Sequence, residues 1–219
     1  MTLELLHVEA FAEAIRSLLE RTVSADAGVE IIEDGNGALL APPATAADRR
    51  GLRLAVSGVH YLDLDFAFRL RRSSTDGLYV LETSNIALSF ARNREPLVRF
   101  DYVRSRSWGA GHVQVHAESS ALGYLFAVGG RPPPPRTRAQ ELHLPAGPGT
   151  GASLADVIEF AVHDLAVDAQ EDWLHHVHRF RQEDELARLR QLIRHRIRAH
   201  PSTGAADVHG LVAAVEHER

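Results

Sequence analysis

The sequence contains no cysteine, which excludes disulfides, thiol nucleophiles, iron–sulfur clusters and thiolate zinc sites and fits a reducing compartment. It also contains no lysine, because all 24 basic residues are arginine. Schiff-base chemistry and the lysine of a Walker phosphate loop are therefore excluded. No apolar run approaches the roughly 20 residues that cross a bilayer, and the N-terminus lacks a signal-peptide pattern. We expect a cytoplasmic protein that binds neither a membrane nor a cofactor.

The overall composition is that of a folded protein. The 219 residues are 45% hydrophobic and 24% charged, as in an ordinary globular protein, and the length suits one domain. We interpret residues 1–200 as a single α+β domain and residues 201–219 as a C-terminal tail with the pattern of one short helix. The net charge of −5 argues against a surface that coats nucleic acid everywhere but permits a local basic patch.

Alternating patterns in the middle of the chain predict an antiparallel sheet. The clearest pattern covers residues 59–71, where apolar and charged side chains alternate. The Asp76-Gly77 pair that follows is typical of a tight turn and predicts a β-hairpin. Residues 97–103 and 112–118 alternate in the same way, whereas residues 85–91 are ambiguous. Successive strands of this kind form a meander with one buried and one polar face.

Helical patterns flank the predicted sheet on both sides. Residues 3–23 carry an apolar stripe at near-helical spacing, and Thr2 is a suitable N-cap. The stretch that follows, residues 24–50, mixes Gly, Pro and Ala and has room for a strand or two. The predicted fold is therefore α+β, an antiparallel β-sheet meander flanked by an N-terminal helix and C-terminal helices.

The C-terminal part of the chain predicts two helices. Ser153 and Asp156 form a capping signature that begins a helix over residues 154–167. A longer helix is expected from about residue 169 to residue 200, before Pro201. A short strand is expected in the ELHLP segment that precedes both.

Polar side chains gather on the last two alternating segments. Arg99 and Asp101 share one strand face, and His112, Gln114 and His116 share a face of the next. Paired strands would combine them into a cluster suited to general acid/base work on a phosphodiester. Because residues four apart on a strand are roughly 13 Å apart, the two histidines cannot bind one metal, and we interpret His116 with Asp101 as the favoured pair. The alternative is an ordinary solvated sheet face.

Two further groups lie in the predicted last helix. Glu171, His175 and His178 are spaced so that a metal could in principle be held on one helical face, but a solvent-facing role is favoured because no separate ligand is evident. The segment 188–198 is rich in arginine and has no acidic residue. Its Arg190, Arg194 and Arg198 are candidate binding residues for phosphates or an acidic partner helix, and the alternative is a solvated surface.

Several segments resemble known families. RFDYVRSRSW, HVQVHAESSALGYLFA, LHLPAG and SLADVIEFAVHD, with Trp173, resemble an uncharacterised actinobacterial family over roughly residues 97–175. The family has an arginine-containing turn where this chain has AGPGTGAS. The order of these segments is also similar to small bacterial toxins of the TumE kind, which a helix-turn-helix antitoxin neutralises. That resemblance implies a role directed at RNA or translation, and the residues carried over are Asp101, His112 and His116.

Two functions follow as expectations, and the sequence leaves open whether the chain is an enzyme. The first is a toxin-like protein acting on RNA or translation, with Arg99, Asp101, His112 and His116 as catalytic residues and RNA or an antitoxin as partner. The second is a non-catalytic accessory module that binds protein or nucleic acid through the arginine-rich C-terminal helix. The two differ in where the important residues lie, on the sheet face or on the terminal helix.

Overall fold

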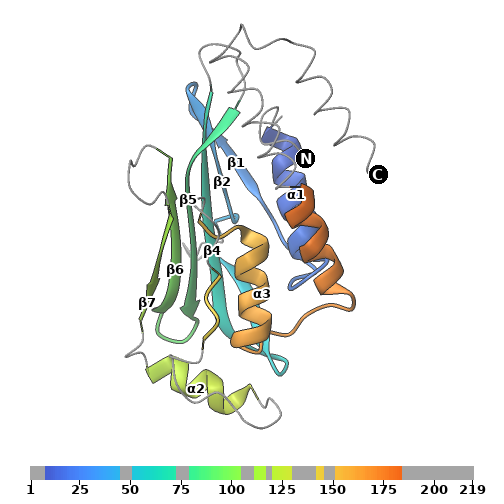
Figure 1. The fold of residues 1–219 in the computed structure, drawn as a ribbon, viewed down its shortest axis with the longest axis vertical. Coiled ribbons are helices and arrows are strands. Elements are labelled where there is room, and N and C mark those ends of the chain that lie inside the picture. Colours follow the sequence, from blue (N-terminus) through green and yellow to red (C-terminus); the bar gives the residue numbers. More distant parts are fainter. Residues whose placement is uncertain are drawn as a thin grey trace, which may run out of the picture.

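The computed structural model of the chain describes residues 8–44, 51–72, 79–104, 111–116, 120–129, 142–145 and 151–183. These residues form an α+β fold in which an N-terminal helix precedes a seven-stranded antiparallel sheet and further helices follow it (Figure 1). The elements are α1 (Val8–Glu20), β1 (Glu30–Glu33), β2 (Gly37–Ala41), β3 (Leu52–Val56), β4 (Val59–Arg72), β5 (Tyr79–Phe90), β6 (Glu95–Val103), β7 (Gly111–Val115), α2 (Ser120–Val128), α3 (Leu154–Asp164) and a helix over residues 173–183.

The long strand β4 organises the sheet. The order β1-β2-β4-β5-β6-β7 is antiparallel throughout, and β3 also pairs with β4. Strands β2 and β3 therefore share one edge of β4, because β2 pairs with its end and β3 with its beginning. The predicted α+β meander is confirmed, although the turn residues Asp76 and Gly77 lie outside the described part of the chain.

One face of the sheet carries the core, and α1, α3 and the last described helix cover it, whereas α2 lies at one end of the sheet (Figure 1). The alternating apolar residues of β4 are all buried, and Phe68 contacts Phe11 of α1 at a ring distance of 5.7 Å. On the neighbouring strands, Phe100 contacts Phe160 of α3 at 6.0 Å. No described helix lies across the opposite face, which carries the polar half of each alternating strand. The pattern that drives burial thus also leaves a polar face open.

The turn between β3 and β4 is held by Asp168, a residue that follows α3 much later in the sequence. Val56 pairs with Val59, so Ser57 and Gly58 form a two-residue turn with φ values of 53° and 77°. Their backbone N–H groups donate to the carboxylate of Asp168 at 2.9 and 2.7 Å. Two-residue hairpin turns of this kind require positive φ, which glycine adopts readily. Asp168 thereby ties the segment after α3 to the sheet.

Some boundaries agree with the predicted ones and others differ. The stretch 24–50 contains two strands, β1 and β2, as expected, and the ambiguous residues 85–90 belong to β5. The strand expected in ELHLP is wrong for its described residues 142–145, which have no regular structure, and the last helix begins at residue 173 instead of 169. Thr2 and residues 184–219 lie outside the described part.

None of the described helices combines the length and the apolarity needed to cross a bilayer.

The capping box predicted for α3 is present, because Ser153 and Asp156 exchange side-chain to backbone hydrogen bonds.

Candidate active site

The open face of the sheet carries a row of four residues, one from each of four neighbouring strands. Ala67 of β4 lies opposite Asn85 of β5, which lies opposite Asp101 of β6, which lies opposite His112 of β7. All four line a hollow of about 510 Å³. Because Ala67 is small, it leaves space beside the three polar side chains, and the row therefore forms part of the hollow's wall.

Asp101 is the most constrained residue of this row. Although it lies on the polar face, it is only 7% exposed. Its Oδ1 accepts a hydrogen bond from Arg99 Nε at 2.9 Å and another from Asn85 Nδ2. A buried carboxylate needs such compensation, because removing its charge from water is costly. Arg99 and Asn85 therefore fix the orientation of the carboxylate.

The other carboxylate oxygen is unsatisfied and faces an imidazole. His112 Nε2 lies 3.1 Å from Asp101 Oδ2, a distance typical of an ion pair or hydrogen bond. Oδ2 is nevertheless buried and accepts no properly directed hydrogen bond. The imidazole therefore lies close to Oδ2, but its Nε2 is not aligned for a hydrogen bond. Catalytic pairs often have this geometry when no ligand is bound. The His112 side chain is 41% exposed, so its remaining edge is accessible.

A second aspartate–histidine pair on the same sheet provides a comparison. His60 Nε2 lies 2.7 Å from Asp63 Oδ1, and His60 Nδ1 accepts a hydrogen bond from Arg53 Nε at 3.1 Å. Both ring nitrogens of His60 are therefore engaged within the protein. By contrast, no described residue forms a hydrogen bond with His112 Nδ1. Of these two histidines, only His112 therefore has a ring nitrogen that no described residue occupies.

Arginine side chains also line the hollow. Arg69, from the end of β4, lines it together with Arg99, Thr83 and Tyr102. Arg69 Nη1 donates to Asp34 Oδ2 at 2.8 Å. This hydrogen bond, with a second from the backbone of Asn36, lowers the pKa of the Asp34 carboxyl below its usual value. Guanidinium groups suit phosphate because their planar donors bind two oxygens at once.

The sequence hypothesis for this site is corrected in one respect. Arg99, Asp101 and His112 lie together as expected, but the register of β6 and β7 places His112, and not His116, beside Asp101. His116 follows the end of β7, where its backbone N–H donates to Leu97 O at 2.9 Å. It lies four residues from His112, which is roughly 13 Å of extended chain. His116 therefore does not belong to the hollow.

Asn85, Arg69 and Ala67 are among the lining residues that the sequence did not single out. Asn85 lies in a segment of ambiguous pattern, Arg69 is one of the charged residues that alternate over 59–71, and Ala67 has no polar atom. The sequence marks Asn85 only by its position, as an amide near the β-branched residues Thr83 and Ile86 in a run that alternates weakly. Pairing partners, which the sequence does not state, bring these three residues to the hollow.

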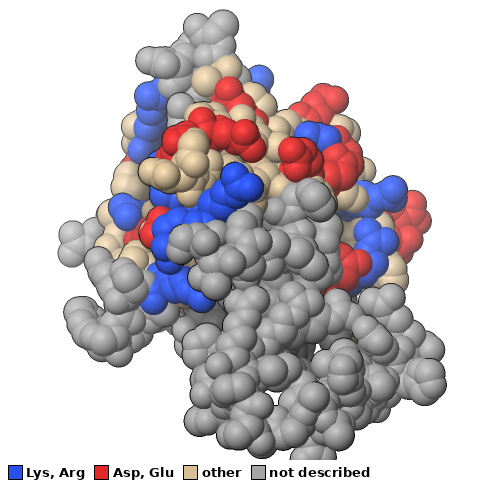
Figure 2. Space-filling view, turned by 90° about the horizontal axis from the view of Figure 1, so that it is seen from above, with Lys and Arg blue, Asp and Glu red and all other residues tan. Residues whose placement is uncertain are grey.

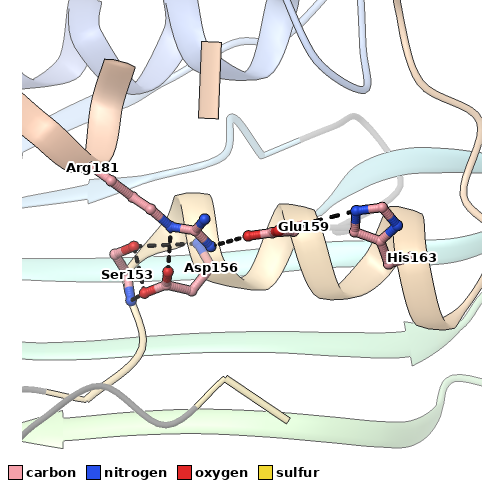
Figure 3. Close-up of polar contacts among 5 residues, drawn as sticks. All are labelled: Ser153, Asp156, Glu159, His163 and Arg181. Carbon is pink, nitrogen blue, oxygen red and sulfur yellow. Dashed lines mark hydrogen bonds and ion pairs between the residues drawn. The ribbon is translucent and has the colours of Figure 1, made fainter. Parts of the chain in front are cut away.

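A separate polar cluster joins α3 to the last described helix (Figure 3). Arg181 Nε lies 2.6 Å from Asp156 Oδ1, and the same guanidinium pairs with Glu159. Glu159 in turn faces His163, whose ring contacts Trp173 at 5.1 Å. Each carboxylate is matched by a donor, so the cluster fastens two helices together and leaves little capacity for a ligand.

The other predicted groups are not assembled into a site by the described residues. Glu171 lies in the turn before the last helix, apart from the helical face that carries His175 and His178. Among the described residues, no three histidine or acidic side chains are grouped closely enough to hold a metal ion. Arg190, Arg194 and Arg198 lie outside the described part. On the surface seen from above, basic and acidic side chains of described residues are interspersed (Figure 2).

Comparison with known proteins gives no match that would identify the site. No family model matches the sequence, and neither a curated protein nor a solved structure matches it. The hollow itself combines a fixed carboxylate, an accessible imidazole beside it, and guanidinium groups on the same wall.

Proposed function

We propose that the chain acts on RNA in the cytoplasm, with the hollow as its phosphodiester site and His112 as the group that transfers a proton. The observation that carries this proposal is the accessible imidazole of His112, 3.1 Å from the buried carboxylate of Asp101. A carboxylate in this position orients an imidazole for proton transfer. The pair is therefore built for proton transfer at a ligand and not for stability alone.

The guanidinium groups of the hollow suit a phosphate-containing ligand. Arg69 and Arg99 both line it, Arg69 paired with Asp34 and Arg99 with Asp101, so both neighbouring carboxylates are offset and the remaining guanidinium N–H groups would meet an anion. Guanidinium groups stabilise the negative charge that develops on a phosphoryl group in the transition state. An RNA phosphodiester supplies both the anion and, in its 2′-hydroxyl, a proton for a base to remove.

The resulting reaction requires no group beyond the chain and water. His112 removes the proton of a ribose 2′-hydroxyl, whose oxygen attacks the adjacent phosphorus and forms a cyclic phosphate. The bond from phosphorus to the 5′-oxygen breaks, and that oxygen takes a proton from the imidazolium or from water. Cleaved RNA would arrest translation, which agrees with the resemblance to TumE-like toxins.

Purified protein and labelled single-stranded RNA test this proposal. Proton transfer by a placed side chain typically contributes a factor of about 10² to 10⁴, so His112→Gln should lower cleavage by at least about 100-fold. Ala67→Leu should also lower it, because the larger side chain fills the hollow. His116→Gln is the matched control and should retain full cleavage.

Two results would contradict the proposal. Absence of RNA cleavage by the wild-type protein would remove the proposed activity, and equal cleavage by His112→Gln would remove the assigned role. A parallel growth assay, with each variant expressed in a sensitive host, shows whether arrest follows the same residue. Equal arrest by wild type and His112→Gln would separate any toxicity from this hollow.

A further inference from the structure

We infer that His112 carries its proton on Nε2, facing Asp101, and meets the ligand with Nδ1, and that Asn85 is the positioning residue that enforces this arrangement. The inference deepens the proposed function, on which it rests for the identity of the ligand-facing atom. The protonation pattern itself is a property of the free protein. It is therefore measurable whether or not RNA is the substrate.

The two oxygens of Asp101 have different surroundings. Oδ1 already accepts from Arg99 and Asn85, whereas Oδ2 is buried without any hydrogen bond. A buried acceptor left without a donor is unfavourable. His112 Nε2, at 3.1 Å, is close enough to supply a donor after a small rotation of the ring.

The tautomer follows from this asymmetry. A neutral imidazole carries its hydrogen on one nitrogen only, and the partner of one nitrogen decides which. With the hydrogen on Nε2, the ring donates to Oδ2. With the hydrogen on Nδ1, the lone pair of Nε2 would face the lone pairs of a carboxylate. The first arrangement is favoured, and it leaves Nδ1 with a free lone pair to accept a proton from a ligand.

Asn85 contributes by fixing which oxygen is free. Its Nδ2 donates to Oδ1 from the neighbouring strand, directly across from Asp101. Without it, the carboxylate keeps only the bond from Arg99, whose side chain is 49% exposed. The carboxylate would then turn more freely, and its hold on the His112 ring would weaken.

Nitrogen-15 NMR of the histidine rings, recorded near pH 8.5 where most rings are neutral, tests the inference. We expect the wild-type His112 ring to be protonated at Nε2, with resonances assigned by their loss in His112→Gln. His60 is the internal reference, because Arg53 donates to its Nδ1 and Asp63 accepts from its Nε2. Its ring should be of the Nε2–H type in every variant. A wild-type His112 ring protonated at Nδ1 overturns the inference.

Asp101→Asn should give the opposite tautomer of His112, with the ring hydrogen on Nδ1. The amide oxygen is expected to take the place of Oδ1, where Arg99 and Asn85 supply donors, so the amide NH₂ faces His112. That NH₂ donates to Nε2 and moves the ring hydrogen to Nδ1. Asn85→Ala is the second variant, and it should give a mixture of both forms with the backbone spectrum otherwise unchanged. An Nε2–H ring that persists unaltered in both variants contradicts the positioning role.

The tautomer measurement separates this inference from the proposed function. If RNA is not cleaved but the His112 ring shows the expected tautomers, the function fails and the assignment of the ring stands. If RNA is cleaved and the wild-type ring is of the Nδ1–H type, the function stands and the inference fails. Each outcome therefore identifies which statement is wrong.

Discussion

Replacing Arg181 by methionine tests whether charge fastens the last described helix to α3. Arg181 Nε lies 2.6 Å from Asp156 Oδ1, the guanidinium also pairs with Glu159, and the three side chains are 23–31% exposed. Partly exposed ion pairs with good geometry contribute up to about 1 kcal/mol each. We therefore expect Arg181→Met to lower the free energy of unfolding by about 1–2 kcal/mol, which corresponds to a Tm roughly 2–8 °C lower for a chain of this length.

Urea unfolding followed by tryptophan fluorescence suits this test, since the indole of Trp173 contacts His163 of α3 and reports on the docked helix. A double-mutant cycle with Glu159→Gln isolates the coupling energy of that pair. Arg179→Met is the matched control. Arg179 lies on the same helix, but its ion pair with Glu183 is long, at 4.0 Å, and about half exposed. It should change stability by less than about 0.5 kcal/mol. Equal losses for both arginines, or a coupling energy near zero, would refute the argument.

Three further outcomes are expected. Asp168→Ala removes the acceptor of the β3–β4 turn and should cost about 1 kcal/mol in the same unfolding assay, with Asp168→Asn intermediate; equal stability of all three proteins would contradict this. Burial, with neighbouring positive charges, lowers the pKa of His176 below 6.5. As the pH falls, His176 is therefore protonated in the unfolded chain before it is protonated in the folded protein, and stability should fall as pH drops below about 6.5. His176→Gln should flatten that dependence, and parallel pH curves for the two proteins would exclude the residue as its source. His60→Gln should destabilise the fold by about 1 kcal/mol, whereas His112→Gln should change stability by less than about 0.5 kcal/mol.

The strand predicted closest to its observed bounds, β4, is the one whose two faces differ most. In β4 every second residue is a large apolar side chain and the intervening ones are mostly charged, so the period is unmistakable. In β5 the residues between Ile86, Leu88 and Phe90 include Ala87, which is itself apolar and favours helices. The period is therefore blurred there, and the segment that carries Asn85 could not be assigned.

Register is what the sequence could not provide for the candidate site. His112 and His116 have the same parity in the strand, so alternation places both on the polar face and favours neither as the partner of Asp101. Register shifts between Leu88 and Ser89 and between Arg69 and Leu70 change the partners further along the sheet. Loop geometry and bulges set these offsets, and they leave little trace in a hydrophobic pattern.

Residue types alone do not distinguish the two aspartate–histidine pairs on this sheet. Both have a ring nitrogen within 3.1 Å of a carboxylate oxygen and an arginine nearby. In one, the arginine donates to the imidazole, so His60 has no nitrogen left and acts as a structural link. In the other, the arginine donates to the carboxylate, so the ring of His112 keeps a nitrogen that no described residue occupies. Because proton transfer to a ligand requires such an unoccupied atom, the placement of one guanidinium makes the pair of His112, and not that of His60, the candidate for the proposed chemistry.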